Sequence, residues 1–405
     1  MKNKLLLLYI FIVIIPINVL LINQIFTFPR ESKKVFKEEP TTSKVKLENS
    51  KEIDFTFVGD LLFEPSFYDA INNGYDKDKY FKKVKKYFED DDISLANMEV
   101  IIGNENMDTS IKGYSLCAPE YIGDLVSKLD MQVLSTVNNH ANDRGVDGIN
   151  SSIDYFKNNT DILTVGTYKD ETDRNTNRII DINGVKVGFL AYTNRTNKPT
   201  YGKNRNMVAL FKDPISGMFT KEYKDKITNE VSNLKKNSDI VIVMVHWGRE
   251  YLFAPNEEML EFANFLNKLG VDIIVGSHSH TIQPIDIIGD EHKTLVYYSM
   301  GNFASQDNLL PTLGDASMQR KVTNAYQIGL LSKVKVKYDN NKMEILDIST
   351  IPIINYYDKS INNFELIPFN EYTSEYEKSH RRYNYGLNNR FINNLFNEII
   401  DEKYQ

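Results

Sequence analysis

A single cysteine, Cys117, and a single tryptophan occur among the 405 residues of the chain. One cysteine excludes a disulfide within the chain, and it excludes a structural zinc site that takes two or more thiolates from it. A basic excess is also missing, because 48 lysines and arginines stand against 55 aspartates and glutamates. The net charge of −7 argues against a nucleic-acid-binding protein, which usually carries a basic face. With 41% hydrophobic residues, the chain is typical of a globular protein large enough to bury a core without disulfides.

Charge is absent from the N-terminal stretch that follows Lys4, up to residue 29. Residues 5–22 are nearly all apolar, and about 20 such residues cross a bilayer as a helix. Lys2 and Lys4 precede this stretch and favour a cytoplasmic N-terminus. We therefore expect residues 1–26 to form a signal-anchor transmembrane helix, with the rest of the chain as an extracellular, single-pass membrane protein. A cleaved signal peptide is the alternative, although residues 23–28 contain no small-residue cleavage motif.

The remainder of the chain divides by composition into a linker and an α/β region. Residues 27–52 are charged and lack apolar periodicity, which is typical of a flexible linker. Alternating strand and helix patterns then predict a sheet covered by helices, with a main domain at 53–310 that residues 311–405 complete with strands and peripheral helices. Strands are predicted at 53–58, 93–96, 132–137, 162–166, 178–182, 186–192, 240–245, 271–275, 294–298, 326–336 and 342–348. Helices are predicted at 80–89, 119–129, 148–158, 221–236 and 256–269, and Asn183-Gly184 predicts a hairpin turn.

Histidine is scarce, with six in the chain, but four of them follow predicted strands. His278 and His280 lie in a Gly-Ser-His-Ser-His run directly after the strand at 271–275. His140 and His246 also end apolar runs. Functional residues concentrate on loops, and neutral imidazole is a common ligand of first-row metals. The four histidines therefore predict one assembled site.

Polar residues suited to metal binding follow five of the predicted strands. In an open α/β sheet, ligands bind at the carboxyl ends of the strands, so we expect these residues to come together. They supply two carboxylates, one amide oxygen and four imidazoles, from Asp60, Glu99, Asn139, His140, His246, His278 and His280. This set of donors suits one or two divalent metal ions of the Mn, Fe or Zn type.

Several polar residues near these motifs have two interpretations. Arg249 either pairs with its acidic neighbour at the surface or holds a substrate carboxylate with its bidentate guanidinium. Asn302 either lines the site and contacts substrate or supports the site from behind. Asp143 either belongs to the site or only forms a turn. The remaining histidines, His292 and His380, lie among charged residues and are expected at the surface.

Taken together, the motifs resemble the capsule synthesis protein CapA family, whose members are associated with bacterial poly-γ-glutamate capsules. The resemblance covers residues 53–305 and rests on six motifs in the family's order. These are Gly59-Asp60, Asn97-Met98-Glu99, Asn138-Asn139-His140-Ala141-Asn142-Asp143-Arg144-Gly145, His246-Trp247-Gly248-Arg249-Glu250-Tyr251, Gly276-Ser277-His278-Ser279-His280 and Tyr298-Ser299-Met300-Gly301-Asn302-Phe303. CapA-like domains in turn resemble calcineurin-like metallophosphoesterases. The resemblance thus implies a β-sandwich flanked by helices that holds two metal ions.

The resemblance also implies a role for each residue of the site. The metal ligands would be Asp60, Glu99, Asn139, His246, His278 and His280. Glu99 stands at the position that bridges two ions, and His140 stands where the phosphoesterases protonate the leaving group. Leu62 departs from the phosphoesterase pattern, because it occupies the histidine position of the first Asp-x-His motif. This departure predicts that one of the two metal sites is weaker.

Two functions from different classes follow from these expectations. The first is a metal-dependent hydrolase or transferase that acts on poly-γ-glutamate or a phosphoester, with His140 as general acid. The second is a non-catalytic component of a membrane polyglutamate synthetase complex, which binds the anionic polymer and hands it on. Both predict capsule synthetase subunits as partners and a membrane location, and neither involves nucleic acid.

Overall fold

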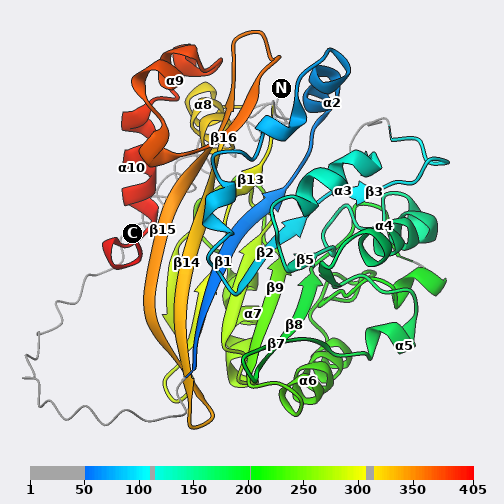
Figure 1. The fold of residues 1–405 in the computed structure, drawn as a ribbon. Helices are drawn as coiled ribbons and strands as arrows, with labels where there is room; N and C mark the ends of the chain where they lie inside the picture. The colour runs from blue at the N-terminus through cyan, green and yellow to red at the C-terminus, as the bar shows by residue number, and fades with distance from the viewer. Residues whose placement is uncertain (1–50, 110–114, 201, 307–313) are drawn as a thin grey trace, which may run out of the picture. The chain divides into compact units, whose positions relative to one another are not determined.

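Two β-sheets packed face to face form the centre of the computed structural model, which describes residues 51–405 except 110–114, 201 and 307–313 (Figure 1). The first sheet has the strand order β16-β15-β14-β1-β2-β5-β6, with β13 beside β1. Its strands are β1 (Lys51–Leu61), β2 (Ile93–Met98), β5 (Val133–Ser135), β6 (Leu163–Val165), β13 (Asn302–Ala304), β14 (Ile328–Asp339), β15 (Lys342–Tyr357) and β16 (Phe364–Pro368). Strands β1, β2, β5 and β6 run parallel, and β14 to β16 add antiparallel strands on the other side of β1.

The second sheet has the order β11-β12-β10-β9-β8-β7. Its strands are β7 (Arg178–Ile182), β8 (Val185–Thr193), β9 (Ile240–His246), β10 (Ile273–Ser277), β11 (Ile285–Ile288) and β12 (Thr294–Tyr297). The four central strands are parallel. A short additional pair consists of β3 (Ile101–Ile102) and β4 (Cys117–Ala118). The predicted hairpin is confirmed, because β7 and β8 are antiparallel and are joined at Asn183 and Gly184, whose φ angles of 53° and 80° suit a tight turn.

The two sheets share one apolar core. Phe57 on β1 meets Tyr297 on β12 edge to face, with ring centroids 5.5 Å apart. The Tyr297 hydroxyl lies 2.7 Å from the Ser332 hydroxyl of β14, so its polar end is also satisfied between the sheets. Burial of each such side chain contributes roughly 1.5–3 kcal/mol, which favours the face-to-face arrangement. The predicted mixed α/β sandwich is therefore observed.

Helices flank the sandwich (Figure 1). They are α2 (Pro65–Asn72), α3 (Glu120–Ser127), α4 (Gly145–Asn159), α5 (Glu171–Arg174), α6 (Lys221–Lys235), α7 (Glu257–Lys268), α8 (Ala316–Ala325), α9 (Ser374–Ser379) and α10 (Asn389–Ile399). Within the described residues, we find no helix of the length and hydropathy that a membrane crossing requires. The predicted transmembrane segment at 1–26 and the linker up to residue 50 lie outside the described residues.

The predicted helix at 80–89 is wrong. This segment forms turns and a 3₁₀ helix at Lys85–Tyr87. Its apolar spacing is helical, and Tyr80, Phe81 and Val84 are all buried. However, the Tyr80 carbonyl accepts the Leu366 N–H of β16, which takes the acceptor that a continuing α-helix would use. Tertiary pairing therefore overrides the local pattern.

His380 is buried, which corrects its expected surface position. Its Nε2–H donates to the Asn355 carbonyl (3.1 Å), and its Nδ1 accepts the Arg382 N–H (3.0 Å). Burial lowers the pKa of His380 to about 4. The unfolded chain, with a histidine pKa near 6.5, therefore takes up this proton before the folded protein does.

We expect His380→Gln to weaken the acid sensitivity of the fold. The stability linked to neutral His380 is complete above about pH 6.5 and is lost as the pH falls toward 4, by roughly 3 kcal/mol in all. Glutamine keeps one donor and one acceptor but does not titrate. Urea unfolding at several pH values should therefore give a flatter profile for His380→Gln than for His292→Gln, a control at a half-exposed histidine. Parallel profiles would contradict this assignment.

Candidate metal centre

The predicted metal ligands meet where the carboxyl ends of strands from both sheets face each other. Asp60 is the second-last residue of β1, Glu99 follows β2, and Asn139 follows β5. His246 ends β9, and the loop after β10 carries the two remaining histidines. Pairing fixes this alignment, because Asp60 is opposite Asn97 and Ser277 is opposite His246. All the predicted ligands are buried, namely Asp60, Glu99, Asn139, His246, His278 and His280.

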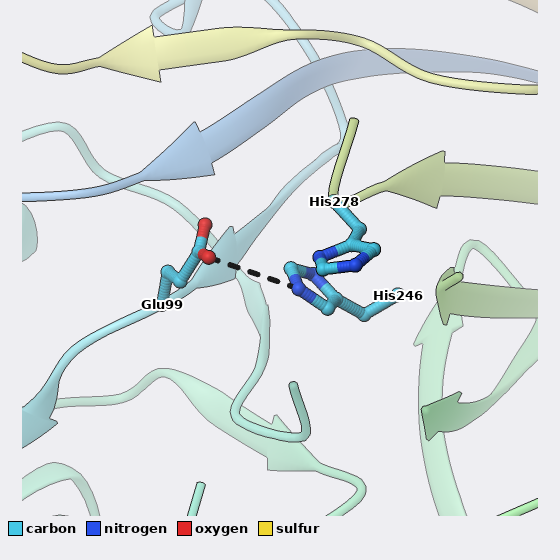
Figure 2. Close-up of side chains that lie close together, drawn as sticks. All are labelled: Glu99, His246 and His278. Atoms are coloured by element: carbon cyan, nitrogen blue, oxygen red, sulfur yellow. Dashed lines mark ion pairs between the residues drawn. The ribbon is translucent and has the colours of Figure 1, made fainter. Parts of the chain in front are cut away.

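Two groups of donors share Glu99. The first group is Glu99, His246 and His278, and Figure 2 shows the two imidazoles side by side near the carboxylate. Their ring centroids are 4.5 Å apart and the rings are tilted by 51°. The distance from His246 Nε2 to Glu99 Oε1 is 3.7 Å. The second group is Asp60, Glu99 and His280, with His280 Nε2 3.6 Å from Glu99 Oε1. Within each group, the donor atoms lie within 4.8 Å of one another.

The protonation states suit a cation at this place. Burial raises the pKa of the Glu99 carboxyl well above its usual range, and the neighbouring Asp60 carboxylate adds to the shift. Burial also lowers the pKa of His246 and of His278 well below the usual range, so both imidazoles are neutral at pH 7. Among the described residues, neither Glu99 oxygen has a hydrogen-bond partner, and neither has His278 Nδ1. Buried polar atoms without partners are costly, so these donors fit a divalent metal ion.

Polar side chains behind the ligands fix their orientation. Asn97 Nδ2 donates to Asp60 Oδ1 (2.7 Å), and Ser277 Oγ lies 2.8 Å from His246 Nδ1. Asn302 Oδ1 lies 2.9 Å from His280 Nδ1, and Asn302 Nδ2 donates to the Tyr326 carbonyl at 3.0 Å. Such contacts hold a ligand histidine in one tautomer and one rotamer. Asn302 is completely buried and supports the site from behind, as one of its two interpretations has it, while a contact with substrate stays a prediction.

The backbone at the centre adopts a conformation that is uncommon for residues other than glycine. His278, His280 and Tyr251 have φ angles of 94°, 53° and 67°. Such left-handed conformations store strain and concentrate at functional sites. Gly276, just before the histidines, has a different reason to be glycine, because a Cβ there would lie 2.2 Å from the Tyr298 carbonyl oxygen. The loop after β10 is thus held by its close packing.

His140 belongs to the site but differs from the ligands. Its Nδ1 lies 2.8 Å from Asp143 Oδ2, and the same oxygen accepts the Leu116 N–H at 2.6 Å. Its Nε2 lies 3.4 Å from Asn197 Nδ2 at the wall of a cavity. Asp143 is therefore the partner of His140, which resolves its two interpretations. In the sequence, this pairing was indicated only by the position of Asp143 three residues after His140.

A cavity of about 550 Å³ opens beside the two donor groups. Leu62 lies in its wall, so the position of the missing histidine is apolar. Arg249 is exposed and lines a neighbouring cavity, apart from this one. Glu250 and Tyr251 of the His246 motif also line the main cavity. No pattern in the sequence indicated its other lining residues, namely Ser115, Leu116, Asn197, Lys198 and Tyr326.

Solved structures with a similar backbone fold include a phosphoesterase and a phosphatase. The calcineurin-like phosphoesterase YfkN from Bacillus subtilis matches 86% of this chain and 97% of its own, with 13% identity and a TM-score of 0.39. A phosphatase from Mycoplasma pneumoniae matches 75% and 94%, with 16% identity and a TM-score of 0.43. Both scores lie below 0.5, and the family assignment rests on sequence.

Sequence comparison gives closer relationships. PGA biosynthesis protein CapA of Bacillus subtilis (strain 168) is 28% identical over 280 residues, which cover 69% of this chain and 70% of that protein. Capsule biosynthesis protein CapA of Bacillus anthracis is 27% identical over 282 residues, which cover 68% and 65%. The family model described as bacterial capsule synthesis protein PGA_cap matches residues 54–307, which include all the predicted ligands. The chain therefore belongs to the bacterial capsule synthesis protein family, as its motifs predicted.

Proposed function

We propose that this protein is a metal-dependent hydrolase or transferase that acts on poly-γ-glutamate during capsule synthesis. The relatives named for capsule and PGA biosynthesis support the polymer. One observation carries the catalytic part: Glu99 belongs to both groups of donors, has no hydrogen-bond partner for either oxygen in the described ranges, and lines the same cavity as His140. A protein that only binds a polymer needs neither a buried cluster of this kind nor a positioned proton donor.

The residues that would hold metal are those of the two donor groups. Glu99, His246 and His278 form the first, and Asn139 Oδ1 adjoins it, 2.9 Å from His246 Nε2. Asp60 and His280 complete the second with the shared Glu99. A divalent metal polarises a substrate oxygen as a Lewis acid.

His140 and Asp143 would move the proton. The Asp143 carboxylate accepts a hydrogen bond from the His140 Nδ1–H, which leaves His140 Nε2 directed at the cavity. When Nε2 also carries a proton, the carboxylate stabilises the imidazolium, as in other histidine–carboxylate pairs. His140 would then hold a proton at the atom that faces a leaving group. This arrangement supports general acid catalysis.

The test is hydrolysis of the polymer by the full-length protein in detergent. We expect Mn²⁺ or Zn²⁺ to permit release of shorter γ-glutamyl fragments, and a chelator to stop it. His246→Ala combined with His278→Ala should abolish release, because it removes two donors of one group, whereas His292→Ala should leave it unchanged. Fragment size is measured by chromatography. Intact polymer and intact phosphodiester substrates in the presence of bound metal would overturn the hydrolase proposal.

The alternative is an assembly component that binds the polymer and passes it to synthetase subunits. Leu62 favours it, because this apolar residue stands where a further metal ligand would strengthen the second donor group. In that case the wild-type protein would bind poly-γ-glutamate and leave its length unchanged.

We also propose that the domain is held outside the cell by the N-terminal segment. The support is the charge-free apolar stretch after Lys4. Protease digestion of wall-stripped cells tests this placement, because an extracellular domain is degraded while cytoplasmic proteins stay intact. Recovery of the intact domain from the cytoplasm would contradict it.

A further inference from the structure

A second cavity, of about 540 Å³, adjoins the candidate metal centre and contains two arginines. Arg195 follows β8, and Arg249 follows β9, and both side chains line this cavity. Arg195 Nη2 also lies 3.4 Å from Nε2 of His278, which belongs to the first donor group. The guanidinium of Arg195 therefore lies between the metal centre and the second cavity.

The charges within this cavity leave both arginines available. Its other cation, Lys212, forms an ion pair with Glu258, whose Oε1 also accepts Asn194 Nδ2 at 2.9 Å. Its other acidic residue, Glu257, is exposed in the first turn of α7. In the ranges that the structure describes, no carboxylate lies within ion-pair distance of Arg195 or Arg249. Two guanidinium groups in one hollow suit an anion with planar oxygens, because each offers a bidentate fork.

We propose that Arg195 and Arg249 form a subsite for a carboxylate of an anionic polymer, next to the unit held at the metal centre. The identity of the polymer rests on the proposed function, since γ-linked polyglutamate carries one free carboxylate on each unit. The two cavities lie on either side of the turn after β9, because Glu250 lines the main cavity and its neighbour Arg249 lines the second. The subsite thus selects a substrate longer than one unit, and it explains how an acidic protein holds an acidic polymer.

Lys198, on the other side of His140, is a poorer candidate for the same task. Its Nζ donates to the Asp143 carbonyl at 2.5 Å and lies 3.4 Å from Ser115 Oγ. The ammonium group is therefore engaged by the loop that holds His140. Arg195 directs Nη2 at His278 Nε2, and in the described ranges neither arginine forms an ion pair with a carboxylate.

The test measures binding of a γ-linked glutamate dimer and decamer to full-length protein in detergent without metal. We expect Arg195→Gln combined with Arg249→Gln to weaken decamer binding by about tenfold or more, because two charge-assisted contacts are lost. Dimer binding should change little. The matched control is Arg320→Gln combined with Arg390→Gln, which removes the same charge from exposed positions outside both cavities. Decamer binding should also lose part of its salt dependence in the first variant alone.

Three results would overturn the subsite. They are equal losses in the two double variants, unchanged decamer binding in the Arg195 and Arg249 variant, and wild-type binding of poly(glycerol phosphate) but not of the decamer. The last result would assign the arginines to phosphate. Release of shorter fragments is measured in parallel with metal added. If the protein binds the decamer but releases no fragments, the proposed catalysis is refuted and the proposed subsite is not. If the glutamine variant unfolds, the same binding measurements are made on a variant with lysine at both positions, which keeps the charge but lacks the bidentate guanidinium.

Discussion

Glu99→Gln should abolish metal binding at both donor groups and leave the metal-free protein at least as stable as the wild type. The carboxylate is shared by both groups, so one substitution affects both. In the metal-free protein, burial favours the neutral carboxyl, and glutamine has nearly the same shape and no charge to bury. Saturating metal at a thousand times its dissociation constant adds about 4 kcal/mol to the stability of the wild type. The variant should lose this increment entirely.

Two measurements on the same samples decide this prediction. Metal content is determined by elemental analysis after dialysis, and thermal unfolding is recorded with metal and with chelator. Glu250→Gln is the control, because Glu250 lines the same cavity but belongs to neither donor group. Wild-type metal content in Glu99→Gln would show that the buried carboxylate does not bind metal.

His140→Asn should reduce turnover by about 10²–10⁴-fold while metal content stays at the wild-type value. The His140 imidazole lines the cavity, and its contact with Asp143 does not involve the donor groups. Asp143→Asn should reduce turnover as well, because Asp143 fixes the orientation of His140. The double variant should be no slower than His140→Asn, since residues that act as a unit are not additive.

Single-turnover rates and metal content are measured together for these variants, with His292→Asn as the control. An unchanged rate in His140→Asn would remove the proton donor from the mechanism. Loss of metal in His140→Asn would make His140 a ligand. If wild-type protein binds polymer without turnover, the same variants report polymer affinity instead, and the assembly function is favoured.

Much of the metal centre could be predicted from the sequence, because its residues follow recognisable strands. The run before His278 is short, apolar and β-branched, and parallel strands bring such ends to one edge. The antiparallel strands near the C-terminus were also visible, although β15 continues to Tyr357, nine residues beyond the predicted end. Buried strands and the loops after them carry a strong local signal.

The contacts between side chains could not be predicted in the same way. Arg249 and Glu250 are neighbours in sequence, yet the turn after β9 directs them to different cavities. The segment after β8 brings Asn197 to His140, across from the other sheet, and no local pattern indicates that distance. His380 has charged neighbours in sequence but packs against Tyr357. Tertiary packing decides each of these positions.

The donors of the centre come from both sheets, and this origin gives a bound cation a mechanical role. Asp60, Glu99 and Asn139 lie in or after strands of the first sheet, and His246 and His278 lie at or after the ends of strands of the second. A cation held by them would act as a clasp across the sandwich, joining segments that are more than 100 residues apart in the chain. The two sheets could then separate only after the bound ion is released. The difference between metal-bound and chelated protein in thermal unfolding therefore reports how firmly the layers are fastened, as well as how tightly the ion is bound.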